Sequence, residues 1–190
     1  MDVRTDLQFD EAHIPGAVCI TVLNAGFGTR LAWIAKHGQD VVFIGRDDQD
    51  ARRAARLATA VGIRDLGGFL AGGMTSWREE HREVGKIERL QAEELVARKE
   101  QDPSLQVLDV RERSEWDEAR IPGSVNRPYH DIREIPGEID PDRPVAVICS
   151  SGQRSAVAAS LLSRAGAHQV IHVADGGVRT WERQGGPIER

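Results

Sequence analysis

The sequence contains only two cysteines among its 190 residues, Cys19 and Cys149. Two cysteines are too few for a disulfide scaffold or for the four-cysteine and Cys2His2 zinc-finger patterns, so each is interpreted separately. Long apolar runs are also missing, because the longest candidate, residues 14–23, is interrupted by Pro15 and Gly16. A membrane-spanning helix needs roughly 18 apolar residues. We therefore expect a protein that does not cross a membrane.

Positive charge is not in excess. The chain has 25 Lys and Arg against 30 Asp and Glu, a formal net charge of −5. This is the wrong sign for a protein that neutralises nucleic-acid phosphates, so nucleic acid is not an expected partner. The amino terminus, residues 1–11, is acidic and lacks the basic and then apolar layout of a secretory signal, which predicts a cytoplasmic location.

Several motifs of metal and nucleotide chemistry are absent from the sequence. The six histidines show no HExxH or other ligand spacing, and neither GxSxG nor the phosphate-binding GxxxxGK[ST] occurs. We therefore expect no metal and no cofactor.

The chain does contain an internal repeat. Residues 2–18 match residues 109–125 at an offset of 107, with ten of 17 positions identical. Residues 41–77 align with residues 145–181 at an offset of 104 and share ten of 37 positions. Self-similarity over two ordered blocks indicates a tandem duplication, with three extra residues in the first copy between the blocks.

The repeat predicts two domains. The first copy spans residues 1–82, a linker covers 83–86, and the second copy spans 87–190. Met1 stands where the repeat places Leu108, so the first copy lacks a strand, a helix and most of a second strand. Either the chain begins inside a longer protein, or another chain fills the gap.

Short apolar runs alternate with helical patterns in the second copy, which predicts an α/β fold with a parallel sheet. The expected strands are residues 87–90, 106–109, 145–148 and 170–173, and the expected helices are residues 91–100 and 154–165, the latter ending at Gly166. Ligands of such sheets bind beyond the carboxyl ends of the strands.

Cys149 ends one predicted strand, and the loop of residues 150–155 leads directly into a helix. Consecutive backbone N–H groups at a helix N-terminus form an anion-binding nest, which stabilises a thiolate. Gly152 allows the loop to turn tightly. This setting favours a nucleophilic Cys149 over a buried structural one. Cys19 lies in an apolar run without a basic loop and is interpreted as a packing residue.

Charged residues near this loop allow two interpretations each. Arg154 could orient an anionic substrate or hold the loop through an internal ion pair. Asp109, Arg111 and Glu115 could form a polar brace under the loop entry or a solvated charge cluster.

Three further side chains are assigned no chemistry. Trp77 and Trp181 each follow a Gly-Gly turn and are expected to anchor a terminal helix in the core. His130 lies on a connecting loop that could border the site, although a surface histidine is the favoured interpretation.

The second copy resembles the rhodanese family. The resemblance rests on three motifs in order: D-V-R-x-x-x-E-W-x-x-A-R-I-P-G-S-V-N-R-P, the loop C-S-S-G-Q-R-S, and G-G-V-R-T-W. It implies tandem rhodanese-like domains and a sulfurtransferase that moves sulfane sulfur from a donor to a thiol or cyanide through a persulfide. Cys149 matches the catalytic cysteine. The residues matching the loop that cradles the persulfide are Ser150, Ser151, Gly152, Gln153, Arg154 and Ser155.

The first copy resembles the same family but lacks the nucleophile. Gly45 aligns with Cys149, and Asp47, Asp48 and Asp50 replace Ser151, Gly152 and Arg154. Two like charges in close contact repel by about 1 kcal/mol even in bulk water, so an anionic donor is disfavoured and the copy is expected to be catalytically silent.

The segment N-A-G-F-G-T-R-L-A-W-I-A is similar to the first of two rhodanese modules that follow a metallo-β-lactamase-like domain in certain persulfide-oxidising fusion proteins. The resemblance implies a persulfide dioxygenase of that class as a partner, fused or separate. The incomplete first copy also suggests a homodimer.

Two other functions stay open. A phosphatase of the Cdc25 type has a related fold but a Cys-x5-Arg loop, whereas Cys149 and Arg154 are separated by four residues. A non-catalytic binding module is the other alternative. The sequence leaves the sulfur donor open between thiosulfate and a low-molecular-weight persulfide, and it leaves the acceptor open.

Overall fold

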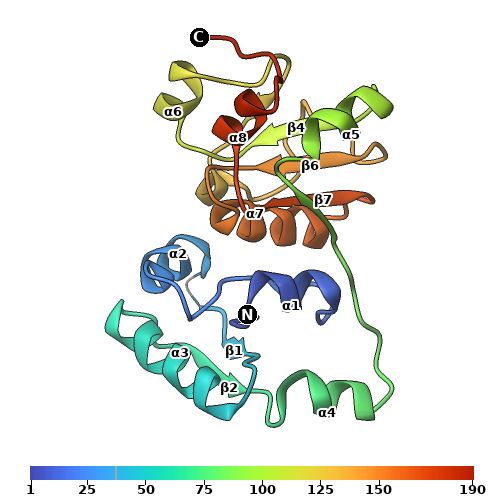
Figure 1. The fold of residues 1–190 in the computed structure, drawn as a ribbon. Helices are drawn as coiled ribbons and strands as arrows, with labels where there is room; N and C mark the ends of the chain where they lie inside the picture. The colour runs from blue at the N-terminus through green and yellow to red at the C-terminus, as the bar shows by residue number, and fades with distance from the viewer. Residues whose placement is uncertain (37) are drawn as a thin grey trace. The chain divides into compact units, whose positions relative to one another are not determined.

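The computed structural model describes residues 1–36 and 38–190, which form two compact units (Figure 1). Unit 1 is Met1–Lys86 and unit 2 is Ile87–Arg190. Both contain parallel strands connected by helices, so the predicted α/β fold class is confirmed. No helix in the described parts of the chain is both long and apolar enough to span a membrane.

Unit 2 is built on a five-stranded sheet in which neighbouring strands run parallel, in the order β3-β7-β6-β4-β5. Its strands are β3 (Glu88–Gln91), β4 (Gln106–Asp109), β5 (Val125–Asn126), β6 (Val145–Ile148) and β7 (Val170–Ala174). β4 and β6 have the bounds that their apolar runs predict. β6 is buried at every position, as expected for an inner strand of a parallel sheet. β3 and β7 differ from the prediction by one residue.

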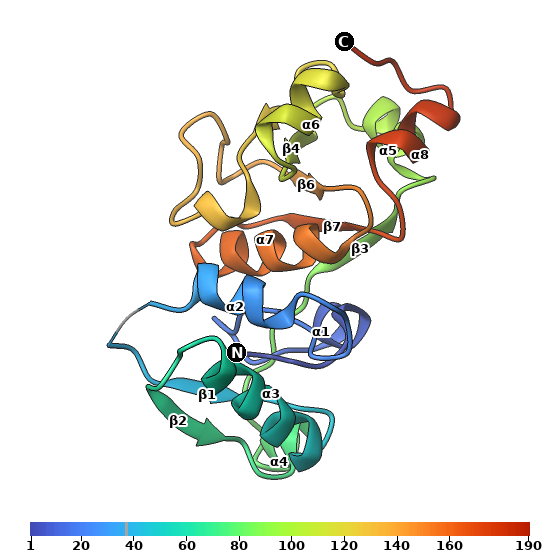
Figure 2. The same cartoon turned by 90° about the vertical axis from the view of Figure 1, so that its left-hand side faces the viewer.

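Helices cover both faces of this sheet, with α7 on one face and α5 and α8 on the other (Figures 1 and 2). The helices of unit 2 are α5 (Leu95–Gln101), α6 (Arg113–Glu118), α7 (Gln153–Arg164), α8 (Val178–Arg183) and the short 3-10 helix η1 (Tyr129–Asp131). The expectation of a helix over residues 91–100 is wrong in its first turn. Gln91 belongs to β3, and its N–H donates to the Glu94 carboxylate at 2.9 Å. That contact closes a turn before the helix begins.

A hydrophobic cluster joins α5 and α8 to the sheet of unit 2. Leu95 of α5 and Trp181 of α8 pack in one buried group with Ala146 and Ile148 of β6. Trp181 is 3% exposed, and its indole Nε1 donates to the carbonyl of Pro187 at 2.8 Å. The expectation that Trp181 anchors the terminal helix is confirmed.

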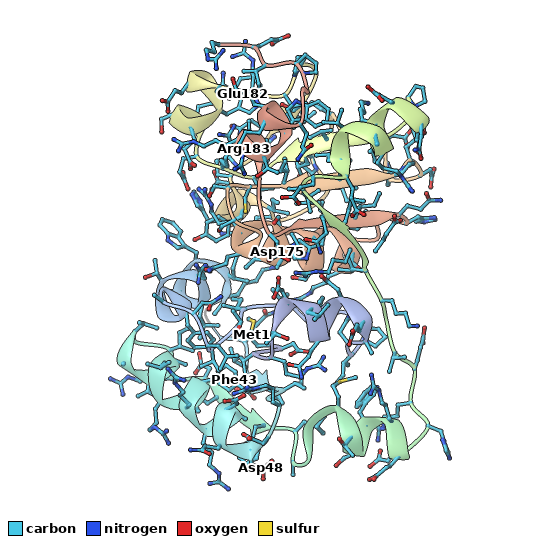
Figure 3. The ribbon with its side chains drawn as sticks, viewed as in Figure 1. Met1, Phe43, Asp48, Asp175, Glu182 and Arg183 are labelled. Carbon is cyan, nitrogen blue, oxygen red and sulfur yellow. The ribbon has the colours of Figure 1, made fainter. Side chains whose placement is uncertain are left out.

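Unit 1 repeats the central part of this arrangement. Its elements are α1 (Asp6–Glu11), α2 (Phe27–Ile34), β1 (Val41–Phe43), α3 (Asp48–Ala60), β2 (Leu66–Phe69) and α4 (Gly73–Glu79). β1 and β2 pair in parallel, and Asp2 forms parallel bridges with both Cys19 and Ile44. The N–H of Ile44 donates to the carbonyl of Met1 at 2.9 Å; Met1 and Phe43, the last residue of β1, are labelled in Figure 3. Asp2, Cys19, β1 and β2 thus occupy the places of β4, β5, β6 and β7.

The first elements of the fold are missing from unit 1. In its described residues no strand lies on the outer side of β2, the place that β3 takes beside β7. Val42 is 43% exposed, whereas its counterpart Ala146 is fully buried under the cluster that includes Leu95. Trp77 is only half-buried, so its predicted role as a core anchor is wrong. In unit 2, Leu95 of α5 packs in one cluster with Ala146 and Trp181, the counterparts of Val42 and Trp77. A helix in the position of α5 would therefore complete the core around Val42 and Trp77.

Cys19 is 2% exposed in the interior of unit 1. Burial raises the pKa of its thiol well above the usual value, and the neighbouring Asp2 carboxylate adds to that rise. A thiol that resists ionisation is a poor nucleophile. The interpretation of Cys19 as a packing residue is confirmed.

Candidate functional site

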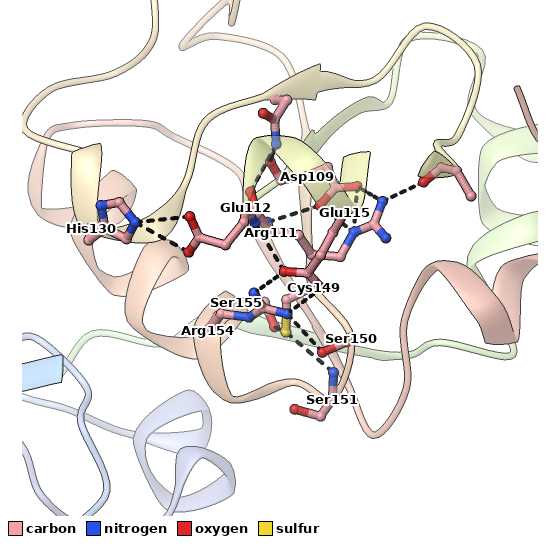
Figure 4. A network of polar contacts seen from close by, with 12 residues as sticks. Asp109, Arg111, Glu112, Glu115, His130, Cys149, Ser150, Ser151, Arg154 and Ser155 are labelled. Carbon is pink, nitrogen blue, oxygen red and sulfur yellow. Dashed lines mark hydrogen bonds and ion pairs between the residues drawn. The ribbon is translucent and has the colours of Figure 1, made fainter. Parts of the chain in front are cut away.

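Cys149 follows β6 directly, beyond the carboxyl end of the strand (Figure 4). Its Sγ accepts hydrogen bonds from the backbone N–H groups of Ser151 at 3.4 Å and Gly152 at 3.2 Å. Gly152 has φ of +89° and is the N-cap residue of α7, so the loop turns into the helix at this residue. The predicted strand, loop and helix are therefore present, with backbone donors aimed at the sulfur.

The thiol lies beneath its own loop. Cys149 is fully buried, while Ser150 and Ser151 are exposed at the rim. Ser155, also fully buried, places its Oγ 3.5 Å from Sγ, and Gln153 opens α7. Of the loop positions expected from the sequence, Ser151, Gly152 and Ser155 contact the sulfur atom directly, and Ser150 and Ser151 are the exposed residues above it.

A buried histidine holds the loop from the sheet. His172 of β7 is fully buried, and its Nε2 lies 2.9 Å from the carbonyl oxygen of Gly152. A carbonyl only accepts, so Nε2 carries the hydrogen. Ser155 Oγ lies 2.9 Å from the same carbonyl oxygen and 3.0 Å from that of Val173, and its single hydrogen is shared between these two acceptors. Sequence reasoning missed His172. The available signal was a histidine inside the apolar run Val170–Ala174, where a buried polar group needs a partner.

Gly177 brings a second segment against the loop. A Cβ at this position would lie 2.0 Å from the Cys149 carbonyl oxygen and 2.7 Å from Ser150 Cα. Only glycine permits this approach. The sequence analysis treated Gly177 as part of a turn and did not predict its contact with the loop.

Arg154 forms an internal ion pair. Its Nη1 donates to Glu115 Oε2 at 2.5 Å and its Nη2 to Glu115 Oε1 at 3.0 Å. Nη2 also donates to Ser150 Oγ at 2.9 Å. The guanidinium lowers the pKa of the Glu115 carboxyl, and Glu115 raises the pKa of Arg154. Of the two predicted roles, the structure contains the one that holds the loop.

Asp109 and Arg111 form a separate buried pair. The Asp109 carboxylate accepts from Arg111 Nε at 2.9 Å and Nη2 at 2.6 Å. Nη2 also donates to the carbonyl of Ala119 at 2.7 Å. Burial raises the pKa of Asp109, and Arg111 opposes that rise. The alternative of a solvated cluster is wrong for these two residues, and the brace differs from the prediction because Glu115 pairs with Arg154.

His130 belongs to the edge of this network. Its Nε2 lies 3.2 Å from Glu112 Oε1 and its Nδ1 lies 3.1 Å from Asp131 Oδ1. The side chain is 18% exposed. His130 therefore ties η1 to the residue that caps α6, which is more contact than a surface histidine implies.

Unit 1 keeps the same frame without a nucleophile. Arg4 donates from Nη2 to Asp2 at 2.6 Å and to the Ala12 carbonyl at 2.7 Å, as Arg111 does with Asp109 and Ala119. The loop itself has closed, because a Cβ on Gly45 would lie 2.4 Å from its own loop, at the Asp47 carbonyl oxygen.

The three carboxylates of the unit 1 loop all have local partners. Asp47 caps α3 by accepting the N–H of Asp50 at 2.8 Å, and Asp48 accepts the N–H of Gly72 at 3.2 Å. Asp50 pairs with Arg46 at 2.5 Å. Over residues 1–36 and 38–190, no group of three or more His, Cys, Asp or Glu residues is arranged to hold a metal ion.

Unit 2 is thus an α/β domain in which a loop between a parallel strand and a helix holds a cysteine within reach of backbone N–H groups. The chain belongs to the rhodanese-like domain family, whose model matches residues 1–80 and again residues 91–184. Both copies of the repeat are therefore members of one family.

Named relatives match about half of the chain. YrkF of Bacillus subtilis, named as a candidate sulfur carrier protein, is 35% identical over 98 residues, 52% of this chain and 52% of its own length. The chain thus spans about half of that relative. A sulfurtransferase of Allochromatium vinosum is 31% identical over 54% of this chain and 94% of its own. The thiosulfate sulfurtransferase GlpE of Pseudomonas syringae is 34% identical over 50% of this chain and 88% of its own.

Proposed function

We propose that this chain is a sulfurtransferase that carries sulfane sulfur as a persulfide on Cys149. The observation that carries the proposal is the pair of backbone N–H groups, from Ser151 and Gly152, that point at Sγ. Such donors stabilise negative charge on sulfur, whether it is the thiolate or the terminal sulfur of a persulfide. The names of the relatives support the same class of activity.

The reaction consists of two displacements at sulfur. The Cys149 thiolate attacks the sulfane sulfur of thiosulfate, the sulfur–sulfur bond of the donor breaks, and sulfite leaves with the electron pair. With a low-molecular-weight persulfide as donor, the leaving group is a thiolate. A thiolate or cyanide then attacks the terminal sulfur of the Cys149 persulfide, and the Cys149 thiolate is released.

The remaining loop residues have supporting roles in this proposal. Ser150, Ser151, Gly152, Gln153, Arg154 and Ser155 form the cradle that holds the terminal sulfur. Arg154 shapes the cradle through Glu115 and Ser150 instead of meeting the donor. Unit 1 is catalytically silent, because Gly45 supplies no nucleophile. The proposed reaction uses no metal or cofactor, because both steps are displacements at sulfur that need no external oxidant or reductant.

Intact mass spectrometry tests the proposal. The full chain is incubated with thiosulfate or glutathione persulfide, and the gain of one sulfur atom is measured. We expect the gain in the wild type and in Cys19→Ala, and its loss in Cys149→Ser. Cys19→Ala is the matched control, because it removes the other thiol from an interior site.

Two results would contradict the proposal. A sulfur gain that persists in Cys149→Ser would place the acceptor elsewhere. No gain with either donor, in folded protein, would favour a non-catalytic binding module. Hydrolysis of an aryl phosphate that depends on Cys149 would instead support a Cdc25-type phosphatase.

A further inference from the structure

A cavity of about 580 Å³ adjoins the Cys149 loop within unit 2. Ser150 contributes to its wall from the loop, and Val178 and Arg179 contribute from the start of α8. Its volume falls within the roughly 300–1,000 Å³ of pockets that enclose organic ligands. The small dianion thiosulfate would fill only a minor part of it.

The charges of the lining balance. Three arginines and three glutamates line the cavity: Arg111, Arg179, Arg190, Glu115, Glu118 and Glu182. Their formal charges sum to zero, so the cavity offers a dianion no net attraction. A substrate that carries both a positive and a negative group matches such a lining better.

Most of these charges already have partners. Arg111 pairs with Asp109, and Glu182 of α8, labelled in Figure 3, pairs with Arg190. Across the part of the chain that the structure describes, the side chains of Arg179 and Glu118 make no hydrogen bond or ion pair, and both are exposed. One cation and one anion of the lining are therefore available to a ligand.

Arg154 is not available in the same way. Both of its terminal nitrogens donate to Glu115, and one of them also donates to Ser150. A donor held by Arg154 would have to displace a bidentate carboxylate. Arg179, by contrast, follows two residues after Gly177, which packs directly on the Cys149 carbonyl. The backbone that leads into Arg179 is thus held against the Cys149 loop.

We propose that this cavity binds the amino-acid part of a low-molecular-weight thiol or persulfide. Arg179 binds a carboxylate, Glu118 binds an ammonium group, and the sulfur end lies at Ser150, next to Cys149. The inference rests on the proposed function and assigns its substrate class: amino-acid persulfides and thiols rather than inorganic thiosulfate.

The rate of sulfur loading, followed by intact mass, tests the substrate class. Glutathione persulfide carries carboxylates and an ammonium group, and 2-hydroxyethyl persulfide carries neither. We expect Arg179→Gln to slow loading from glutathione persulfide about tenfold, the effect of losing one charge-assisted hydrogen bond, and to leave loading from the neutral persulfide unchanged. Arg183→Gln is the matched control, because Arg183 lies on the same helix outside the cavity lining.

A binding measurement separates this inference from the proposed function. Glutathione is titrated into the Cys149→Ser variant, with and without Arg179→Gln or Glu118→Gln, and backbone amide shifts are followed by NMR. Weaker binding in both double variants would support the cavity even if the wild type loads no sulfur. Equal effects of Arg179→Gln on both persulfides, or glutathione binding that ignores both residues, would overturn the inference.

Discussion

The Glu115–Arg154 ion pair holds the shape of the Cys149 loop. It joins α6 to the first turn of α7 through two hydrogen bonds. Because Arg154 stays charged at all ordinary pH values, only Glu115 titrates. Its pKa is lower in the folded chain than in the unfolded one.

This lowered pKa predicts a pH dependence of stability. At pH values above the ordinary pKa of a glutamate, about 4.3, the ion pair contributes its full stabilisation to unit 2. That contribution is lost as the pH falls through the lowered pKa of Glu115. Since Glu115 is 35% exposed, we expect the contribution to be about 1 kcal/mol or less. Comparing the free energies of unfolding of wild type and Glu115→Gln at pH 7 and pH 3 checks this. A difference that grows on acidification would contradict it.

At the scale of elements, β7 and α7 hold the loop from both sides. His172 of β7 donates to the Gly152 carbonyl, and Gly152 is the N-cap of α7. We expect His172→Phe to weaken the loop by about 1 kcal/mol, because the Gly152 carbonyl loses one hydrogen bond and keeps the donor of Ala156. The sheet should stay folded, while sulfur loading of Cys149 slows.

A positioning role for His172 is distinguished from a general loss of stability by rescue. His172→Gln restores an N–H donor and should recover much of the loading rate, which a variant that is merely destabilised would not do. The backbone amide shifts of Ser151 and Gly152 report the geometry of the loop directly. Unchanged loading in His172→Phe would show that Ser155 and the backbone N–H of Ala156, which donates to the same carbonyl at 3.0 Å, are sufficient to hold it.

The elements around the site were predictable to different degrees. The strand before Cys149 and the helix after the loop were predictable, because a short apolar run and a helical pattern with a glycine stop are local signals. The start of α5 was not, since it depends on one side-chain contact of Glu94. The pairing of Glu115 with Arg154, 39 positions apart, depends on tertiary packing that no local pattern contains. The contact of Gly177 with the loop has the same origin.

At the scale of the whole molecule, the two units differ in completeness. Unit 2 has a five-stranded sheet with helices on both faces, whereas the described residues of unit 1 form a two-stranded sheet with an exposed Val42. The duplication and the missing first elements were predictable from the offsets of the repeat. The half-buried state of Trp77 was not, because it depends on elements that are missing around it. The cytoplasmic location, the homodimer and the metallo-β-lactamase-like partner stay predictions.

Unit 2 has a complete hydrophobic core, so we expect it to fold and to carry sulfur without unit 1. We expect residues 87–190, expressed as a separate chain, to fold cooperatively and to gain one sulfur atom to the same extent as the full chain. Circular dichroism during thermal unfolding and intact mass after incubation with donor check the two parts. A folded fragment that does not load sulfur would assign unit 1 a role in the reaction.

The Asp–Arg pair occurs in both units with the same partners. Asp2 and Arg4 reach the Ala12 carbonyl, and Asp109 and Arg111 reach the Ala119 carbonyl. The pair that organises the fold is therefore separate from the loop that carries Cys149 in unit 2. A copy of the fold can therefore keep this frame with another residue in the place of the cysteine, as unit 1 does with Gly45. Under the proposed function, selection for structure and selection for activity act on different residues, and we expect unit 1 to be under the first alone.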